Sequence, residues 1–155
     1  MSPDLSLSSP AFADGELLPR KCGFAAENVN PPLHISGVPD EAESLALTMR
    51  DPDAKAATGT VWSHWVVWNV SPDRERILED WDAETADVGR NDFDERGYGG
   101  PDPPDDEHTY RFRLYALDTE LDVLETATVE GLQRAMQGHV VEEAVLEGRY
   151  APIRD

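Results

Sequence analysis

Three short segments of this 155-residue chain carry side chains that can do chemistry, and they lie far apart in the sequence. Imidazole N–H and phenol O–H groups donate hydrogen bonds to anionic oxygens, and carboxylates accept them. Each segment lies where a strand is predicted to begin or end, and loops held by a rigid scaffold often carry binding sites. The candidate residues are Asp51 and Asp53, Trp62 and His64, and His108 and Tyr110.

The stretch GYGGPDPP (97–104), just before the third segment, excludes regular helix and strand. Its glycines free the backbone, whereas its prolines fix φ and remove N–H donors. The chain therefore places a constrained loop immediately before His108 and Tyr110, where a strand is predicted to begin.

Each segment also has an ordinary structural explanation. An Asp-Pro-Asp sequence is most often a plain turn, a histidine beside tryptophans is often a hydrogen-bonded core residue, and a Gly/Pro-rich loop is often architecture. Ser63, His64 and Asp53 suggest a hydrolase triad, but neighbours in a strand point to opposite faces and no Gly-x-Ser-x-Gly elbow is present. Two histidines and a carboxylate would suit a metal ion, yet their dispersed spacing is not diagnostic.

The elements that must position these residues are mostly strands. Short apolar runs rich in β-branched and aromatic residues are separated by Gly, Pro and Asp clusters, which favours strands. Within 110–114, aromatic and aliphatic residues alternate with two arginines, as in a half-buried strand. The predicted strands are Leu5–Ser8, Leu33–Ser36, Ser44–Met49, His64–Val70, Tyr110–Leu117 and Ala144–Tyr150.

One region has helical spacing. Val129, Leu132, Ala135 or Met136, and Val140 recur at three or four residues, which predicts a helix that includes the weak position Gly138. Thr128 is the predicted N-cap. The pattern as a whole predicts mainly antiparallel β structure with one small C-terminal helix.

Length and composition predict a single domain over residues 1–155, with 39% hydrophobic residues. No apolar run approaches the roughly 20 residues that span a bilayer, and the N-terminus lacks the features of a signal peptide. Cys22 is the only cysteine, so an intrachain disulfide and a cysteine-based metal cluster are excluded. We expect a cytoplasmic protein without integral membrane association.

The charge is unusual, because 32 acidic residues face 13 basic ones and the formal net charge is −19. The acidic residues are spread along the chain and lysine is scarce, which predicts an acidic surface adapted to high salt, as in a halophile. At molar salt the Debye length is only about 3 Å, so such a surface repels itself little. The same charge disfavours binding to nucleic acid and to anionic lipid surfaces.

Several ordered motifs resemble the phosphatidylethanolamine-binding protein family, in its prokaryotic Raf kinase inhibitor-like branch. The resemblance extends from about Asn28 to Tyr150, nearly the whole chain. The matching pieces are NVNPPL (28–33), SGVP (36–39), SLALTMRDPDA (44–54), WSHWVVWNV (62–70), NDF (91–93), GYGGPDPP (97–104), HTYRFRLYALD (108–118) and GHVVEEAVLEGRY (138–150).

The resemblance implies an antiparallel β-sandwich with a pocket at one end that binds anions, including phosphate-bearing head groups. It also implies that the 97–104 loop brings its backbone close to the ligand. Because like charges repel, we expect Asp51 or Asp53 to accept a hydrogen bond from His64 or His108 and so to orient the ring; direct donation by a protonated carboxyl is the alternative. Lys55 stands where the family usually has proline. The ligand-binding residues carried over are Asp51, Asp53, Trp62, His64, Gly99, Pro101, His108, Tyr110 and Tyr150.

We therefore predict a non-enzymatic binding protein for a small anionic or phosphorylated ligand, with no cofactor, no metal site and no nucleic-acid partner. Modulation of a partner protein and formation of a homodimer are left open. The alternative is a hydrolase or other small-molecule enzyme that uses the Asp/His pocket.

Overall fold

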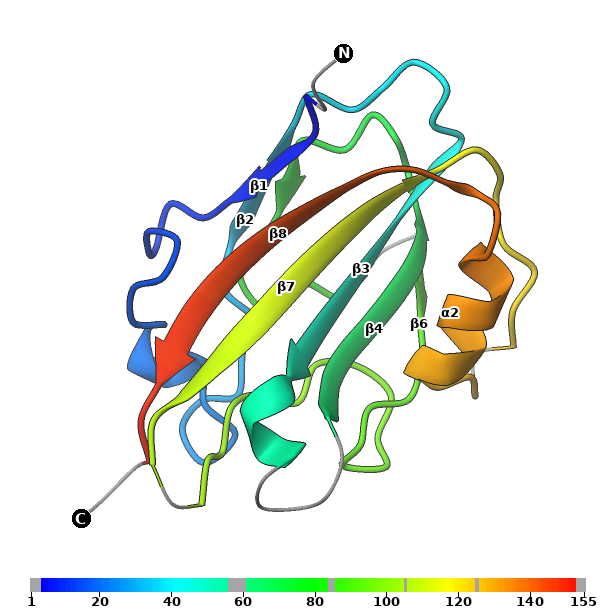
Figure 1. Ribbon diagram of the computed structural model, residues 1–155. Coiled ribbons are helices and arrows are strands. Elements are labelled where there is room, and N and C mark those ends of the chain that lie inside the picture. Colours follow the sequence, from blue (N-terminus) through cyan, green and yellow to red (C-terminus); the bar gives the residue numbers. More distant parts are fainter. Residues whose placement is uncertain (1–3, 56–60, 84–85, 105, 125, 153–155) are drawn as a thin grey trace.

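The computed structural model describes residues 4–55, 61–83, 86–104, 106–124 and 126–152. In these residues the fold consists of two antiparallel sheets with a short α-helix, α2, on one of them (Figure 1). The predicted fold class, mainly antiparallel β with a small C-terminal helix, is confirmed. No helix within the described ranges is both long enough and apolar enough to cross a membrane.

The larger sheet has five strands in the order β6-β4-β3-β7-β8. Its central strands are rich in β-branched and aromatic residues, which pack well on a pleated surface. Strands β3 and β7 pair with Met49 opposite Phe112 and Arg50 opposite Arg111. The strands span Ser44–Asp51 (β3), Trp62–Val70 (β4), Asp87–Val88 (β6), His108–Leu117 (β7) and Val140–Tyr150 (β8).

The smaller sheet has the order β1-β2-β5, with bounds Ser6–Ser8, Leu33–Ser36 and Arg76–Ile77. Its apolar side chains pack against the inner face of the larger sheet and form the main core of a β-sandwich. The alternation predicted in β7 is confirmed, because Tyr110, Phe112 and Leu114 are buried there whereas Arg111 is exposed.

Helix α2, Val129–Met136, covers part of the outer face of the five-stranded sheet (Figure 1). Its buried side chains pack against residues of β3, β4 and β7 in a second hydrophobic cluster. The predicted extension of the helix to Val140 is wrong, because Gly138 adopts a positive φ of 81° and Val140 already begins β8. Thr128 lies at the N-cap as predicted, but its hydroxyl donates to the Glu130 carboxylate and accepts no hydrogen bond from the backbone N–H groups of the helix.

Several predicted strand limits are wrong by a few residues, and the errors cluster at the site. Strand β3 continues to Asp51, and β4 and β7 begin two residues early, at Trp62 and His108, so the candidate residues themselves are strand ends. Strand β8 starts at Val140 rather than Ala144, and β1 starts at Ser6 rather than Leu5. Sequence pattern missed the two-residue strands β5 and β6 and the 3₁₀ helices η1 (Arg20–Cys22) and η2 (Pro52–Ala54).

Candidate ligand-binding pocket

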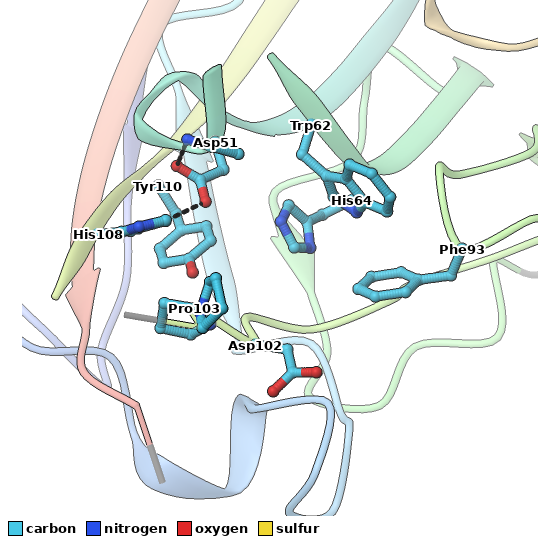
Figure 2. A pocket seen from close by; sticks show the side chains of 10 residues that line it. Asp51, Trp62, His64, Phe93, Asp102, Pro103, His108 and Tyr110 are labelled. Carbon is cyan, nitrogen blue, oxygen red and sulfur yellow. Dashed lines mark hydrogen bonds and ion pairs between the residues drawn. The ribbon is translucent and has the colours of Figure 1, made fainter. Parts of the chain in front are cut away.

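A cavity of about 170 Å³ lies where β3, β4 and β7 meet η2 and the 97–104 loop (Figure 2). Strand ends contribute most of its polar side chains, and the loop after β6 closes it. The lining residues are Asp51, Ala54, Trp62, His64, Phe93, Asp102, Pro103, Pro104, His108 and Tyr110.

A buried, hydrogen-bonded pair of an acid and a base, Asp51 and His108, forms one side of the cavity. The Nδ1 of His108 lies 2.6 Å from Oδ2 of Asp51, and both side chains are about 5% exposed or less. The other carboxylate oxygen of Asp51 accepts the backbone N–H groups of Asp53 (2.9 Å) and Ala54 (3.2 Å). Asp51 is thus the N-cap of η2, with Pro52 at the first position, so local sequence fixes the carboxylate that orients the imidazole.

Burial raises the pKa of the Asp51 carboxyl, because removal from water disfavours the charged form. The hydrogen bond and the charge of His108 oppose this rise, as do the amides of Ala54 and Asp53. The carboxylate is therefore held by three donors, and it fixes the direction of the His108 ring.

His64 points from β4 into the same cavity, but a carbonyl and not a carboxylate holds its ring. Its Nδ1 lies 2.7 Å from the carbonyl oxygen of Gly99. A carbonyl oxygen only accepts, so Nδ1 carries the proton and Nε2 of the neutral ring is an acceptor. Burial lowers the pKa of His64 to about 4, against the opposing effect of the Gly99 and Gly100 backbone, so the ring is neutral near pH 7.

Two lining residues bring buried donors. The hydroxyl of Tyr110 and the indole N–H of Trp62 are buried and have no hydrogen-bond partner among the described residues. Burial raises the pKa of Tyr110, and the nearby carboxylates of Asp51, Asp102 and Asp53 raise it further, so the phenol keeps its proton. Figure 2 shows this hydroxyl directed toward Pro103 of the loop.

The 97–104 loop is held by the segment around η1, far away in sequence. The N–H of Gly100 donates to Oδ1 of Asn28 at 2.7 Å, and the Pro101 carbonyl accepts from the N–H of Phe24 at 2.9 Å. A Cβ on Gly100 would overlap the carbonyl oxygen of Cys22, so only glycine allows this approach. These contacts hold the Gly99 carbonyl within hydrogen-bonding distance of the His64 ring.

Among the described lining residues there are two carboxylates, Asp51 and Asp102, and no lysine or arginine. Phe93 forms an aromatic wall: its ring stacks on Phe24 at 4.3 Å and meets Trp62 and His64 edge-on, each at 5.5 Å between centroids. A ligand here would be recognised by directed hydrogen bonds and aromatic contact, and not by a fixed positive charge.

The structure brings five of the nine predicted ligand residues to the cavity wall: Asp51, Trp62, His64, His108 and Tyr110. The other four lie outside the lining. Asp53 is exposed and accepts the N–H of Thr109, Gly99 acts through its carbonyl behind His64, Pro101 is buried in the loop, and the Tyr150 hydroxyl donates to the carbonyl of Arg20.

Sequence reasoning missed five lining residues, Ala54, Phe93, Asp102, Pro103 and Pro104. The last three belong to the GYGGPDPP loop, and Phe93 to the NDF piece, so each was inside a noted segment. What the sequence did not provide was the direction of their side chains.

The structure does not assemble the triad considered from sequence. Ser63 and His64 are neighbours in β4, and the Ser63 hydroxyl is buried on the face away from the cavity without a partner in the described part of the chain. The Asp53 carboxylate is engaged by Thr109. Over the same described ranges, no three His, Cys, Asp or Glu side chains are grouped so that they could hold a metal ion.

Comparisons with known proteins agree with this architecture. The family model described as phosphatidylethanolamine-binding protein matches residues 8–151. A UPF0098 protein of Methanothermobacter thermautotrophicus is 43% identical, with 94% of this chain and 98% of that protein covered. The crystal structure of a phosphatidylethanolamine-binding protein homologue from Chlamydia trachomatis superposes with a TM-score of 0.91 at 39% identity, covering 99% of this chain and 100% of that one. Escherichia coli YbcL, described as a member of the mammalian family, gives 0.88 at 30% identity, covering 97% and 99%.

Proposed function

This chain belongs to the phosphatidylethanolamine-binding protein family, and from that premise we propose that it is a non-enzymatic binding protein whose pocket holds a small phosphate-bearing ligand. The observation that carries the proposal is the pair of buried donors, the Tyr110 hydroxyl and the Trp62 indole N–H, that line one cavity and have no partner in the described structure. Buried donors left unpaired are costly, and a phosphate group offers acceptors in several directions.

The protonation state of His64 indicates which form of a phosphate ligand would bind. Because Nδ1–H is directed to Gly99, Nε2 of the neutral ring accepts rather than donates. A phosphate monoester loses its second proton near pH 6, so its monoanion still carries a P–OH that can donate to Nε2. The pocket therefore suits a protonated phosphate, bound more tightly as the pH falls from about 7.5 toward 5.5.

The two carboxylates fit this assignment in different ways. Asp51 is held by His108 and two backbone amides and so orients the histidine. Asp102 is exposed and has no such set of donors within the described chain, so it repels an anion or attracts a cationic part of the same ligand. A zwitterionic head group satisfies both requirements.

The test is calorimetric titration of phosphoethanolamine and of inorganic phosphate at pH 5.5, 6.5 and 7.5. Loss of a hydrogen bond to a charged group costs roughly 1.5–3 kcal/mol, so Tyr110→Phe should weaken binding about tenfold or more. Tyr150→Phe is the matched control, since its hydroxyl donates outside the cavity, and it should leave the affinity unchanged. Unchanged affinity in both Tyr110→Phe and Trp62→Phe, with normal melting temperatures, would contradict the proposal.

Catalysis is tested separately with a chromogenic ester and a chromogenic phosphomonoester. The binding-protein proposal expects no turnover above background. A measurable rate that disappears in His64→Ala would replace it with the hydrolase alternative. A protein partner, a homodimer and a cytoplasmic location remain predictions from sequence.

A further inference from the structure

The outer face of strands β3 and β7 carries three arginines around a second cavity, of about 210 Å³. Arg50 of β3 lies opposite Arg111 of β7 in the register, and Arg113 follows on the same face. Tyr115 of β7 and Gln133 of α2 also line this cavity. We define this cavity as the arginine cleft.

The composition of the cleft is unusual for this chain. The protein has 13 lysine and arginine residues against 32 acidic ones, yet the part of the cleft wall that the structure describes has three arginines and no carboxylate. Like charges directly opposite each other in a sheet are destabilising, so the Arg50–Arg111 juxtaposition carries a cost that a bound anion would remove.

Neighbouring glutamates compensate only part of this charge. Strand β8 provides Glu147, 2.8 Å from Nε of Arg111, and Glu143, 3.2 Å from a terminal nitrogen of Arg113. All four side chains are about 40% exposed, so these pairs are weak. A guanidinium has five N–H donors, and each pair uses only some of them.

Arg50 has no ion pair with any described residue, and its buried Nε has no hydrogen-bond partner. Glu130 in the first turn of α2 is near enough to feel its charge: the Thr128 hydroxyl chiefly, and Arg50 to a smaller extent, lower the pKa of Glu130. Buried N–H groups of a guanidinium rarely lack an acceptor, so this one is a candidate donor to a ligand.

We propose that the arginine cleft is a second anion site that binds a small multivalent oxyanion with the geometry and charge of sulfate or phosphate. It is independent of the first cavity, lined by Tyr110, Trp62 and His64, which we call the Tyr110 pocket. Planar guanidinium forks match the oxygens of such groups. The net charge of −19 disfavours a membrane surface, so the ligand is a free anion in solution.

Sulfate separates the two sites. It carries no proton near pH 7 and so offers no donor to His64, whereas the arginine cleft requires only negative charge and acceptor oxygens. Sulfate is therefore expected to bind the cleft, and phosphate to bind both sites.

The experiment is a titration of sodium sulfate, at constant ionic strength, followed by proton–nitrogen NMR of backbone amides and arginine Nε–H groups. The Arg50 Nε–H signal, assigned by its loss in Arg50→Gln, should shift and saturate. Arg50→Gln and Arg111→Gln should each weaken sulfate binding about tenfold or more. Arg76→Gln removes the same charge from the exposed strand β5 and should leave the affinity unchanged, as should Tyr110→Phe.

Three results overturn the proposal: shifts that do not saturate, equal weakening in Arg76→Gln and Arg50→Gln, or shifts that are lost in Tyr110→Phe. The first two would indicate general screening of the negative surface, and the third would place sulfate in the Tyr110 pocket. If Arg50→Gln does not fold, Arg111→Gln and Arg113→Gln decide, because both side chains are partly exposed.

Discussion

The Tyr110 pocket and the arginine cleft are built on the two faces of the same strands, and they differ in almost every chemical respect. Asp51 and Tyr110 face the pocket, whereas their chain neighbours Arg50 and Arg111 face the cleft. The pocket side is mostly buried, holds neutral donors and carboxylates, and has no lysine or arginine among its described residues. The cleft side is partly exposed and holds fixed positive charge. One strand can thus contribute to two opposite sites, because its side chains alternate.

The comparison also shows how environment decides the role of a charged pair. The Asp51–His108 pair is nearly buried, and two backbone amides hold its carboxylate. The Arg111–Glu147 pair on the same strand is about 40% exposed. Because the Asp51–His108 pair is buried, it holds the imidazole in one orientation. The Arg111–Glu147 pair is exposed to water and therefore contributes little to stability.

The largest expected effect tests this contrast between the pairs. His108→Ala leaves Asp51 buried without its ring partner and should lower the free energy of unfolding by about 3–5 kcal/mol. Arg111→Ala removes an exposed pair and should cost less than about 1 kcal/mol. Urea unfolding of both variants measures the two values. Similar costs at the two positions would break the proposed distinction.

The second prediction concerns pH and the pocket side alone. His64 has a pKa of about 4 in the folded chain and 6.5 as its ordinary value. Above pH 6.5 the ring is neutral in both states, so it contributes no pH dependence. As the pH falls from 6.5 toward 4, the unfolded chain binds a proton that the folded chain does not, and stability falls by up to about 3 kcal/mol.

The measurement is the free energy of unfolding between pH 7 and pH 4 in wild type and His64→Asn. The variant should lose this part of the acid sensitivity. His34→Gln, an exposed histidine of β2, is the control and should keep the wild-type slope. An identical slope in His64→Asn would mean that the folded ring titrates normally.

The third prediction uses salt. Raising potassium chloride from dilute buffer to molar concentration screens the −19 charges, which should stabilise the fold by about 1 kcal/mol and raise the melting temperature by about 2–4 °C. Over the same range sulfate should leave the partly exposed cleft more readily than phosphate leaves the buried pocket. A flat or falling melting temperature would remove the halophile interpretation.

The smallest effect concerns the exposed carboxylate of the pocket. Asp102→Asn removes a negative charge beside the proposed phosphate and should tighten inorganic phosphate binding about two- to fivefold, corresponding to at most about 1 kcal/mol. Asp122→Asn changes the net charge equally from an exposed loop elsewhere and is the control. Equal changes in both variants would attribute the effect to overall charge.

Sequence pattern predicted the parts of this fold that rest on local periodicity. The strand interiors and the first two turns of α2 were found, because alternation and helical spacing appear directly in the sequence. Strand ends at Asp51, Trp62 and His108 were missed, because polar residues at or next to these positions look like turn residues until pairing partners are known. The two-residue strands β5 and β6 carry too little pattern to detect.

The site shows the same limit. Motifs indicated which residues converge, but not that Asp51 holds His108 whereas the Gly99 carbonyl holds His64, since both choices satisfy the same residue types. The arginine cleft required the β3–β7 register, which places Arg50 beside Arg111 across 61 residues. Such facts depend on long-range geometry that no short window contains.

The β3–β7 register also constrains how a gene for this protein can change. Inserting or deleting one codon in the interior of β7 would turn every later side chain of the strand to the opposite face, sending arginines into the core and aromatic residues into water. Substitutions on one face, by contrast, leave the other face in place. Point mutations can therefore change the pocket and the cleft separately, whereas insertions and deletions are tolerated only in the connections between strands.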